Sequence, residues 1–454
     1  MKMKTSLYGK SYQFNGVADI LAKANEPKSA DRFQGIAAET VSERVAAKTV
    51  LANLTVGDIT ENPPIPPEGD EVSRVIYDNL NTTIYNEIKS STIGELRETV
   101  LGHSHSGDDL LRLSAGMCSE VIASVAKLCS NMDLVYGASK IRVITRSNTE
   151  LGHKGTLSYR CQPNHPADDV EGILVGLMEG LSYGCGDAII GINPVDDSEE
   201  NVKLIMNAIN DFMLKWKIPT QTCVLGHVTT QMKAVRSGAP VSCIFQSIAG
   251  TQKANDEFGV TAAILHEAYE LISRRGTARG PNLLYFETGQ GSEVSLGADE
   301  GLDEMTLEAR TYGFGRTFKP FMVNNVSGFI GPETLYDGRE MIRANLEDHF
   351  MAKLHGLPMG MAPCYTNHTG IDQNDQETAT MLLAMAGCNY YMGVPGADDV
   401  MLSYQDTSFH DDATLRELLG RTPAPEFFKW MRGLGLMDEN GVLTERGGDA
   451  SIFM

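Results

Sequence analysis

Residues 188–226 read AIIGINPVDDSEENVKLIMNAINDFMLKWKIPTQTCVLG, and they are the clearest indication of the fold class. An apolar run ends in a polar tip at Asn193, and a second apolar run follows at residues 222–226. Between them, apolar residues are spaced three or four apart, so they share one face of a helix. These residues are Val202, Ile205, Ile209, Phe212 and Trp216. A strand, a helix and a second strand predict a βαβ unit.

The same alternation of apolar run, polar tip and helix recurs along the chain. The predicted strands are 156–161, 188–193, 222–226, 241–246, 283–286, 321–325, 357–363 and 390–394. The predicted helices between them are 170–181, 202–216, 229–235, 261–274, 305–312, 339–354 and 377–386. A doubly wound open sheet would also alternate in this way, but eight repeats are the number that closes a TIM barrel, with no repeat left over. We therefore predict an α/β fold, a (β/α)8 TIM barrel.

The chain is longer than a barrel needs. A barrel takes up about 250 residues, and this chain has 454. Helical patterns dominate the N-terminal part, which is interrupted by the proline-rich segment ENPPIPPE at 61–68 and followed by a predicted apolar helix at 111–127. We predict three parts: a mostly helical N-terminal domain (1–110), the barrel (111–405) and a short helical C-terminal extension (406–454).

Composition narrows the class of protein. The chain has 38 Lys and Arg against 59 Asp and Glu, a net charge of −21, which disfavours nucleic acid and anionic membrane as partners. The N-terminus lacks the apolar core of a secretory signal, and no apolar run approaches the roughly 20 residues of a membrane span. We expect a soluble cytosolic protein with reduced, buried cysteines. They are Cys118, Cys129, Cys161, Cys185, Cys223, Cys243, Cys364 and Cys388.

Two strand tips carry side chains suited to a small polar ligand. Arg160 and Gln162 lie two residues apart, so alternation along the first strand directs both to the same side. Asn193 ends the second strand, and Pro194 restricts its backbone. Because strand tips meet at the mouth of a barrel, we predict that these side chains converge. A rim ion pair for Arg160 and a turn role for Asn193 remain alternative interpretations.

Glu287 is the strongest single candidate. It directly follows the fifth apolar run, where a carboxylate is costly to desolvate unless it binds a cation or acts on a proton. The nearby Gly289 and Gly291 resemble a phosphate-binding loop only weakly, because the lysine of a nucleotide-triphosphate site is absent. Ser247 and Glu257 are suited to hydrogen-bond sugar hydroxyls, although each alone also fits a cap or loop role.

Two other groups of reactive residues are weaker candidates. Residues 102–109, GHSHSGDD, hold two histidines and two aspartates, but no third imidazole or cysteine lies nearby, so a solvated loop is favoured over a metal site. Cys364 and His368 suggest a thiol nucleophile with its base, yet a spacing of four in a loop fixes no geometry. We predict no metal site.

Together, the strand tips resemble those of one family. The motifs are RCQPN at 160–164, GINPV at 191–195, LGHVTT at 225–230, FQS at 245–247, LYFETGQGS at 284–292, GFIGPE at 328–333 and CYTNH at 364–368. In this order, and over essentially the whole chain, the sequence resembles the large, catalytic subunit of the ethanolamine ammonia-lyase family. The resemblance implies an adenosylcobalamin-dependent radical enzyme that converts 2-aminoethanol to acetaldehyde and ammonia. It also implies a separate small subunit, with cobalamin between the two subunits.

The resemblance further implies roles for individual residues. Arg160, Gln162 and Asn193 would hold the substrate hydroxyl, and Glu287, helped by Gln162, would meet the amino group. Arg160 and Glu287 would be the catalytic residues, through stabilisation of charge on oxygen and sharing of the ammonium proton. Phe329 and Leu402 would contact the substrate as part of the pocket lining. The cofactor-binding residues would be Asn193, Pro194, Ser247, Glu257, Phe258 and Val326, of which Phe258 and Val326 also line the pocket.

One position departs from the family pattern. Ala362, within Gly360-Met-Ala-Pro363, stands where the family has an aspartate that contacts the substrate ammonium. A charge-assisted hydrogen bond is worth roughly 1.5–3 kcal/mol, or about one to two decades in affinity. Weaker ethanolamine binding, a substitute carboxylate from Asp372 or Asp375, and a different amino alcohol as substrate all remain open.

Three hypotheses for function follow. The first is the catalytic subunit of an ethanolamine ammonia-lyase, and the second is a related cobalamin barrel lyase acting on another small amino alcohol. The third is a non-catalytic assembly scaffold, which has no reason to keep polar side chains together on one face of the barrel. The resemblance also implies a homo-oligomer of large subunits, located either free in the cytoplasm or inside a bacterial microcompartment.

Overall fold

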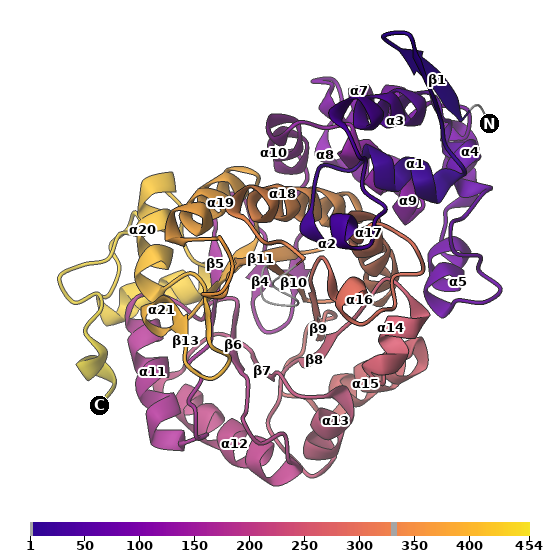
Figure 1. Cartoon of the computed structure of the whole chain (residues 1–454). Helices are drawn as coiled ribbons and strands as arrows, with labels where there is room; N and C mark the ends of the chain where they lie inside the picture. The colour runs from indigo at the N-terminus through magenta and orange to yellow at the C-terminus, as the bar shows by residue number, and fades with distance from the viewer. Residues whose placement is uncertain (1–2, 328–333) are drawn as a thin grey trace.

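A closed ring of parallel strands forms the centre of the molecule. The computed structural model describes residues 3–327 and 334–454 (Figure 1). The strands are β5 (Ser158–Cys161), β6 (Ile189–Ile192), β7 (Thr222–Val224), β8 (Ile244–Ser247), β9 (Leu284–Thr288), β10 (Met322–Ser327), β11 (Met359–Pro363) and β12 (Tyr390–Gly393). Their order is β7-β6-β5-β12-β11-β10-β9-β8, and every neighbouring pair is parallel. The predicted TIM barrel is confirmed.

The seam between β7 and β8 closes by two kinds of contact. At its start, the backbone N–H groups of the two residues before β8 donate to Thr222 O at 3.1 and 3.0 Å. Further along, the side chain of Gln231, from α13 (Val228–Arg236), takes the place of a backbone partner. Its Nε2 donates to Gly226 O at 2.6 Å and Phe245 O at 2.7 Å, and its Oε1 accepts from Phe245 N at 2.9 Å. A side-chain amide thus joins the two strands where their backbones separate.

Eight helices surround the ring, at the places that the sequence predicts for seven of them. They are α11 (Val170–Ser182), α12 (Glu199–Trp216), α13, α15 (Ala262–Arg275), α17 (Glu304–Gly315), α18 (Gly338–Leu354), α19 (Gln373–Met385) and α20 (Phe409–Leu419). Phe409 of α20 packs beside Gly180 of α11, and α20 shares a hollow with α19 on its other side. The predicted C-terminal extension therefore begins with the eighth barrel helix, and α21 (Pro425–Leu434) and a 3₁₀ helix (Ala450–Phe453) follow it. Two short helices, α14 (Gln252–Glu257) and α16 (Ser292–Ser295), lie in the loops after β8 and β9.

The N-terminal part forms a helical layer over one side of the barrel. It contains the hairpin β1 (Lys4–Leu7) and β2 (Lys10–Gln13), then α1 (Val17–Ala24), α2 (Ser29–Phe33), α3 (Val41–Asn53), α4 (Val56–Thr60), α5 (Glu71–Asp78), α6 (Thr82–Ile88), α7 (Ile93–Leu101), α8 (Gly107–Ser114), α9 (Ser119–Lys127) and α10 (Asn131–Ser139). Helices α5, α9 and α10 pack against α17 and α18 (Figure 1). Every residue of α17 is therefore buried. Buried ion pairs cross this boundary, including Lys28–Glu347 and Arg310–Asp70.

The prediction of one apolar helix over residues 111–127 is wrong. The chain forms α8 and α9 there, separated by a turn that contains Gly116. A Cβ at Gly116 would lie 2.5 Å from Tyr85 N, so the backbone of α6 approaches too closely for any larger residue. The periodicity of apolar residues continues through the turn, which is why the sequence suggests a single helix. The divisions at residues 110 and 405 remain proposals, and α8 spans the first of them.

Several smaller predictions concern the surface and the thiols. All eight cysteines are free and buried, as predicted. In the loop at residues 102–106, His103 Nδ1 lies 2.8 Å from the Tyr136 hydroxyl, while Asp109 belongs to the capping box that starts α8. Within residues 3–327 and 334–454, no helix is long and apolar enough to cross a membrane.

Candidate active site

Arg160 lies inside the barrel, near the carboxyl ends of the strands. It is fully buried, and its Nη1 donates to the Tyr285 hydroxyl at 3.1 Å while its Nη2 donates to Asn193 Oδ1 at 3.0 Å. A Cβ at Gly191 would lie 2.6 Å from Arg160 Nε, so glycine on β6 makes room for the guanidinium. Burial alone would lower the pKa of Arg160, but surrounding side chains, Tyr285 first, raise it above its ordinary value. The guanidinium therefore stays charged.

Gln162 and Asn193 belong to one hydrogen-bond network above Arg160. Gln162 Nε2 donates to the carboxylate of Asp399 and to the Tyr404 hydroxyl, the latter at 3.1 Å. Asn164 Nδ2 donates to the same Asp399 carboxylate at 2.8 Å, and Asn164 Oδ1 accepts from Asn193 N at 2.8 Å. Gln162 Oε1 is buried and has no partner among the residues that the structure describes. The network fixes the amides and leaves one acceptor open to a ligand.

Glu287 ends β9 across the barrel from this network. Its strand neighbours in register are Ser247 on β8 and Asn324 on β10. Burial raises the pKa of Glu287, and the charge of Arg160 and the amide of Asn324 oppose that rise. Within the described part of the chain Glu287 forms no ion pair, and the buried amide of Asn324 is the polar side chain that acts on it from the next strand. A half-buried carboxylate without an ion pair, next to a buried amide, is suited to bind a small cation that also carries polar hydrogens.

The segment after β12 folds over the mouth. It contains a short 3₁₀ helix (Pro395–Ala397) and the two-residue strands β13 (Asp398–Asp399) and β14 (Tyr404–Gln405). Beneath it, apolar side chains pack into one cluster that lines the upper barrel. The cluster contains Val326, Ala362, Cys364, Met392 and Tyr404, with Leu402 packed against it. The site is thus a polar centre with an apolar wall and a covering hairpin.

The remaining predicted site residues lie at different depths. Ser247 is half-buried on β8, and Pro194 is buried just after Asn193. Glu257 is exposed at the end of α14, where it lines a groove with Pro66 of the N-terminal layer. Phe258 is half-buried, and its carbonyl oxygen lies 2.9 Å from His227 Nε2. Phe329 lies outside the described residues.

The two aspartates considered as substitutes for the missing carboxylate are engaged elsewhere. Asp372 is the N-cap of α19, where it accepts from the backbone N–H groups of Asn374 and Asp375. Asp375 completes the capping box by accepting from Asp372 N at 3.3 Å. Asp372 is exposed, and neither residue contacts the network around Gln162. The idea that either replaces the aspartate at position 362 is wrong.

Sequence reasoning missed several residues of the site. Asn164, Asp399, Tyr404 and Asn324 all contact the predicted residues or lie beside them. Asn164 stands two residues after Gln162, and its place in the same tip could have suggested it. Nothing in the local pattern could show that Asp399 meets Gln162, because 237 residues separate them in sequence.

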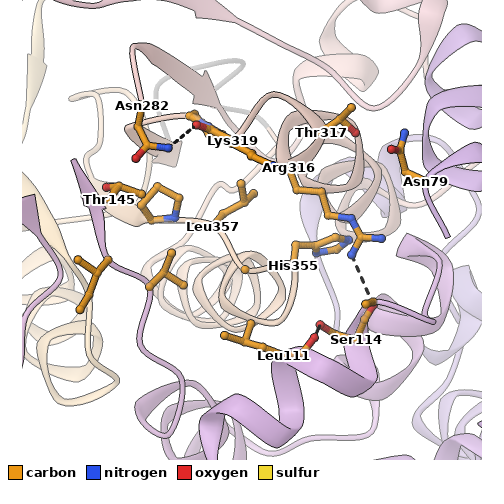
Figure 2. Close-up of a pocket in the computed structure, with 16 residues that line it drawn as sticks. Asn79, Leu111, Ser114, Thr145, Asn282, Arg316, Thr317, Lys319, His355 and Leu357 are labelled. Carbon is orange, nitrogen blue, oxygen red and sulfur yellow. Dashed lines mark hydrogen bonds between the residues drawn. The ribbon is translucent and has the colours of Figure 1, made fainter. Parts of the chain in front are cut away.

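A cavity at the opposite end of the barrel does not belong to this site. It has a volume of about 570 Å³ and is lined by residues just before β9, β10 and β11 (Figure 2). Arg316 donates there to Ser114 O at 3.4 Å, and Asn282 donates to Lys319 O at 2.8 Å. Catalytic residues of TIM barrels come from the carboxyl ends of the strands. We therefore place the candidate site at the end that holds Arg160 and Glu287.

Comparison with known proteins gives one consistent result. A family described as "Ethanolamine ammonia lyase large subunit (EutB)" matches residues 12–446. The ethanolamine ammonia-lyase large subunit of Escherichia coli (strain K12) is 54% identical over 453 residues, covering 100% of both chains. The protein of the same description from Salmonella typhimurium (strain LT2) is 53% identical over 453 residues, again covering 100% of both.

Proposed function

Because the chain belongs to the ethanolamine ammonia-lyase large-subunit family, we propose that it is the catalytic subunit of a carbon–nitrogen lyase. The substrate is 2-aminoethanol, and the products are acetaldehyde and ammonia. The observation that carries this proposal is the balance of charge at the mouth. Glu287 is half-buried and forms no ion pair with any described residue, while the nearby cation Arg160 is committed to Tyr285 and Asn193. A site with this balance selects a small cation.

The geometry supports separate anchors for the two ends of an amino alcohol. The guanidinium of Arg160 and the amides of Gln162 and Asn193 offer hydrogen bonds to a hydroxyl oxygen. Glu287 offers a carboxylate to the ammonium, and sharing of that proton assists movement of the nitrogen. The burial of Arg160 and Gln162 excludes water, which strengthens both interactions and protects reactive species. Leu402 and Val326 belong to the apolar wall, and we assign Phe329 the same role from the family.

The rim of the site fits adenosylcobalamin, the cofactor that the family implies. The Ser247 hydroxyl and the Glu257 carboxylate make no hydrogen bonds within the described residues, and both are accessible. They are suited to the ribose hydroxyls of an adenosyl group, with Asn193, Pro194, Phe258 and Val326 as further contacts. When bound, adenosylcobalamin supplies radical chemistry by homolysis of its cobalt–carbon bond. The chain's own part is to hold the amino alcohol still within a dry cavity.

The proposal includes partners. A small subunit completes the cofactor site, and copies of this chain associate with one another. The complex is located in the cytoplasm, either free or enclosed in a microcompartment. The acidic surface supports neither nucleic acid nor anionic lipid as a partner.

Reconstitution tests the proposal. The chain is mixed with its small subunit, adenosylcobalamin and ethanolamine, and cobalamin absorbance and acetaldehyde are followed. We expect an absorbance change that depends on substrate, and aldehyde production. Glu287→Gln should lower kcat/KM about 10- to 100-fold because the ammonium loses a charge-assisted hydrogen bond. No aldehyde from the complete wild-type complex would contradict the proposal.

Ala362 supports a second candidate, a lyase for a different small amino alcohol. Its side chain is fully buried in the wall of the site and carries no polar group. A panel of amino alcohols in the same assay separates the two. A higher kcat/KM for a substrate larger than ethanolamine would favour the second candidate.

A further inference from the structure

The segment over the mouth carries a buried carboxylate, Asp406, that sequence reasoning did not single out. Gln405 exchanges two backbone hydrogen bonds with Tyr365, just beyond β11, at 3.1 and 2.9 Å. On the other side, the Thr407 hydroxyl donates to Met392 O on β12. Asp406 is therefore held between the carboxyl ends of two neighbouring barrel strands.

One oxygen of Asp406 has no partner. The residue is 2% exposed, and its Oδ1 accepts from Thr407 N at 2.8 Å. Its Oδ2 is buried and makes no hydrogen bond with any described residue. Leaving a buried acceptor unsatisfied is costly, and such groups are concentrated where a ligand binds. The charge of Arg160 acts on Asp406, but the two form no ion pair.

Asp406 belongs to the segment that pairs with the end of the strand carrying Ala362, because Gln405 bonds to Tyr365. Ala362 packs in the same apolar cluster as Tyr404, which lies two residues before Asp406, and Met392, whose carbonyl accepts from the Thr407 hydroxyl just after Asp406. Burial raises the pKa of the thiol of Cys364, two residues after Ala362, and the charges of Asp406 and Glu287 add to that rise. A carboxylate lost from β11 can thus be supplied from the segment that crosses above it.

We propose that Asp406 is the second anionic anchor for the substrate ammonium, opposite Glu287, and that it sets the preference for a protonated amine over a neutral alcohol. This inference rests on the proposed function. It assigns the ammonium of an amino alcohol two carboxylates, one from the end of β9 and one from the covering segment. The covering segment therefore binds substrate directly.

The electrostatics of the free site agree with this assignment. Burial raises the pKa of Asp406 well above its ordinary value; the Thr407 N–H and Arg160 oppose the rise, and Asp399 adds to it. The carboxyl therefore keeps its proton to a higher pH than an exposed aspartate does. An ammonium placed against it favours the charged form, so amine binding releases a proton.

The first experiment measures binding without turnover. The complete complex is loaded with a cobalamin that lacks the adenosyl group, and ethanolamine is titrated by calorimetry against wild type, Asp406→Asn and Asp398→Asn. Asp398 is exposed on the same hairpin and serves as the matched control. We expect Asp406→Asn to weaken ethanolamine binding roughly 10- to 100-fold and Asp398→Asn to have little effect. Binding of 1,2-ethanediol, which lacks the ammonium, should be equal in all three.

Thermal unfolding and a second variant, Ala362→Asp, separate a loss of binding from a loss of folding. Asparagine has the shape of aspartate, and Asp406 forms no ion pair with any described residue, so Asp406→Asn should melt close to the wild-type temperature. Adding Ala362→Asp to Asp406→Asn should restore ethanolamine affinity. If Asp406→Asn does not fold, the single variant Ala362→Asp decides the question. A change in ethanolamine affinity below about threefold supports two existing anchors, and a gain in that affinity of about 10-fold or more overturns the inference. Failure of wild type to bind ethanolamine refutes the proposed function instead, whereas equal binding by wild type and Asp406→Asn refutes only the role of Asp406.

Discussion

One methyl group added at Gly191 should disable the site without touching the substrate. A Cβ there would lie 2.6 Å from Arg160 Nε and 3.0 Å from Cys223 Sγ, while ordinary contact begins at 3.4 Å. The guanidinium must therefore retreat by about 0.8 Å, the difference between 3.4 and 2.6 Å, because the backbone of β6 is fixed by its neighbours on both sides. A misplacement of about 1 Å costs roughly 100-fold in rate, or about 2.7 kcal/mol in the activation barrier.

The assay is steady-state kinetics of the reconstituted lyase, together with thermal unfolding. Gly191→Ala should lower kcat/KM about 100-fold and the free energy of unfolding by about 1–3 kcal/mol, the usual cost of overpacking. Gly433→Ala is the matched control, because a Cβ there meets nothing within 4 Å. The reasoning is refuted if Gly191→Ala folds and retains kcat/KM within about threefold of wild type, since the guanidinium would then not need its present position.

Three further predictions concern the seam, the site's pH dependence and the helical boundary. Gln231→Leu removes the side-chain partner of three backbone groups, two of them buried, so it should cost about 2 kcal/mol or more and speed amide exchange at Phe245. Unchanged exchange would contradict the bridging role. Because burial raises the pKa of Glu287 and of Asp406, ethanolamine affinity should fall as pH decreases through those pKa values. Calorimetry in buffers of different ionisation enthalpy should show that binding releases protons. An affinity that does not depend on pH would contradict this prediction. Burial, and then Asp31, raises the pKa of Glu304 above its ordinary value. Stability should therefore fall as pH rises from that ordinary value through the folded one, and Glu304→Gln should melt with less dependence on pH over this range.

The barrel is predictable because its strands are short, apolar and ended by polar residues. All eight predicted strands overlap the observed ones, and the helix after Asn193 has its apolar face where the spacing places it. The pattern is local, since alternation and helical spacing depend only on near neighbours in sequence. Arg160 and Asn193 could be brought together for the same reason, because parallel strand ends meet at one face.

The covering segment could not be predicted by this approach. Strands β13 and β14 have two residues each, too few to show any periodicity. The sequence around Asp399 and Asp406 is typical of an ordinary loop. Only long-range contacts distinguish them: Asp399 accepts from Gln162, and Gln405, next to Asp406, pairs with Tyr365. The helix break at Gly116 could not be predicted for a related reason, because its cause is the close approach of Tyr85 from another helix.

The helical layer at the N-terminus has a consequence for how the chain is made. Its helices leave the ribosome first, yet α17 and α18, which they cover, begin only at Glu304. Roughly 180 residues separate the end of α9 from that point, which takes about 10–35 s at 5–20 residues per second. Throughout that interval, the apolar faces of these helices have no barrel helices to pack against, and the ammonium of Lys28 lacks its partner Glu347. We therefore expect chaperones to protect nascent chains of this protein until the later half of the barrel is translated.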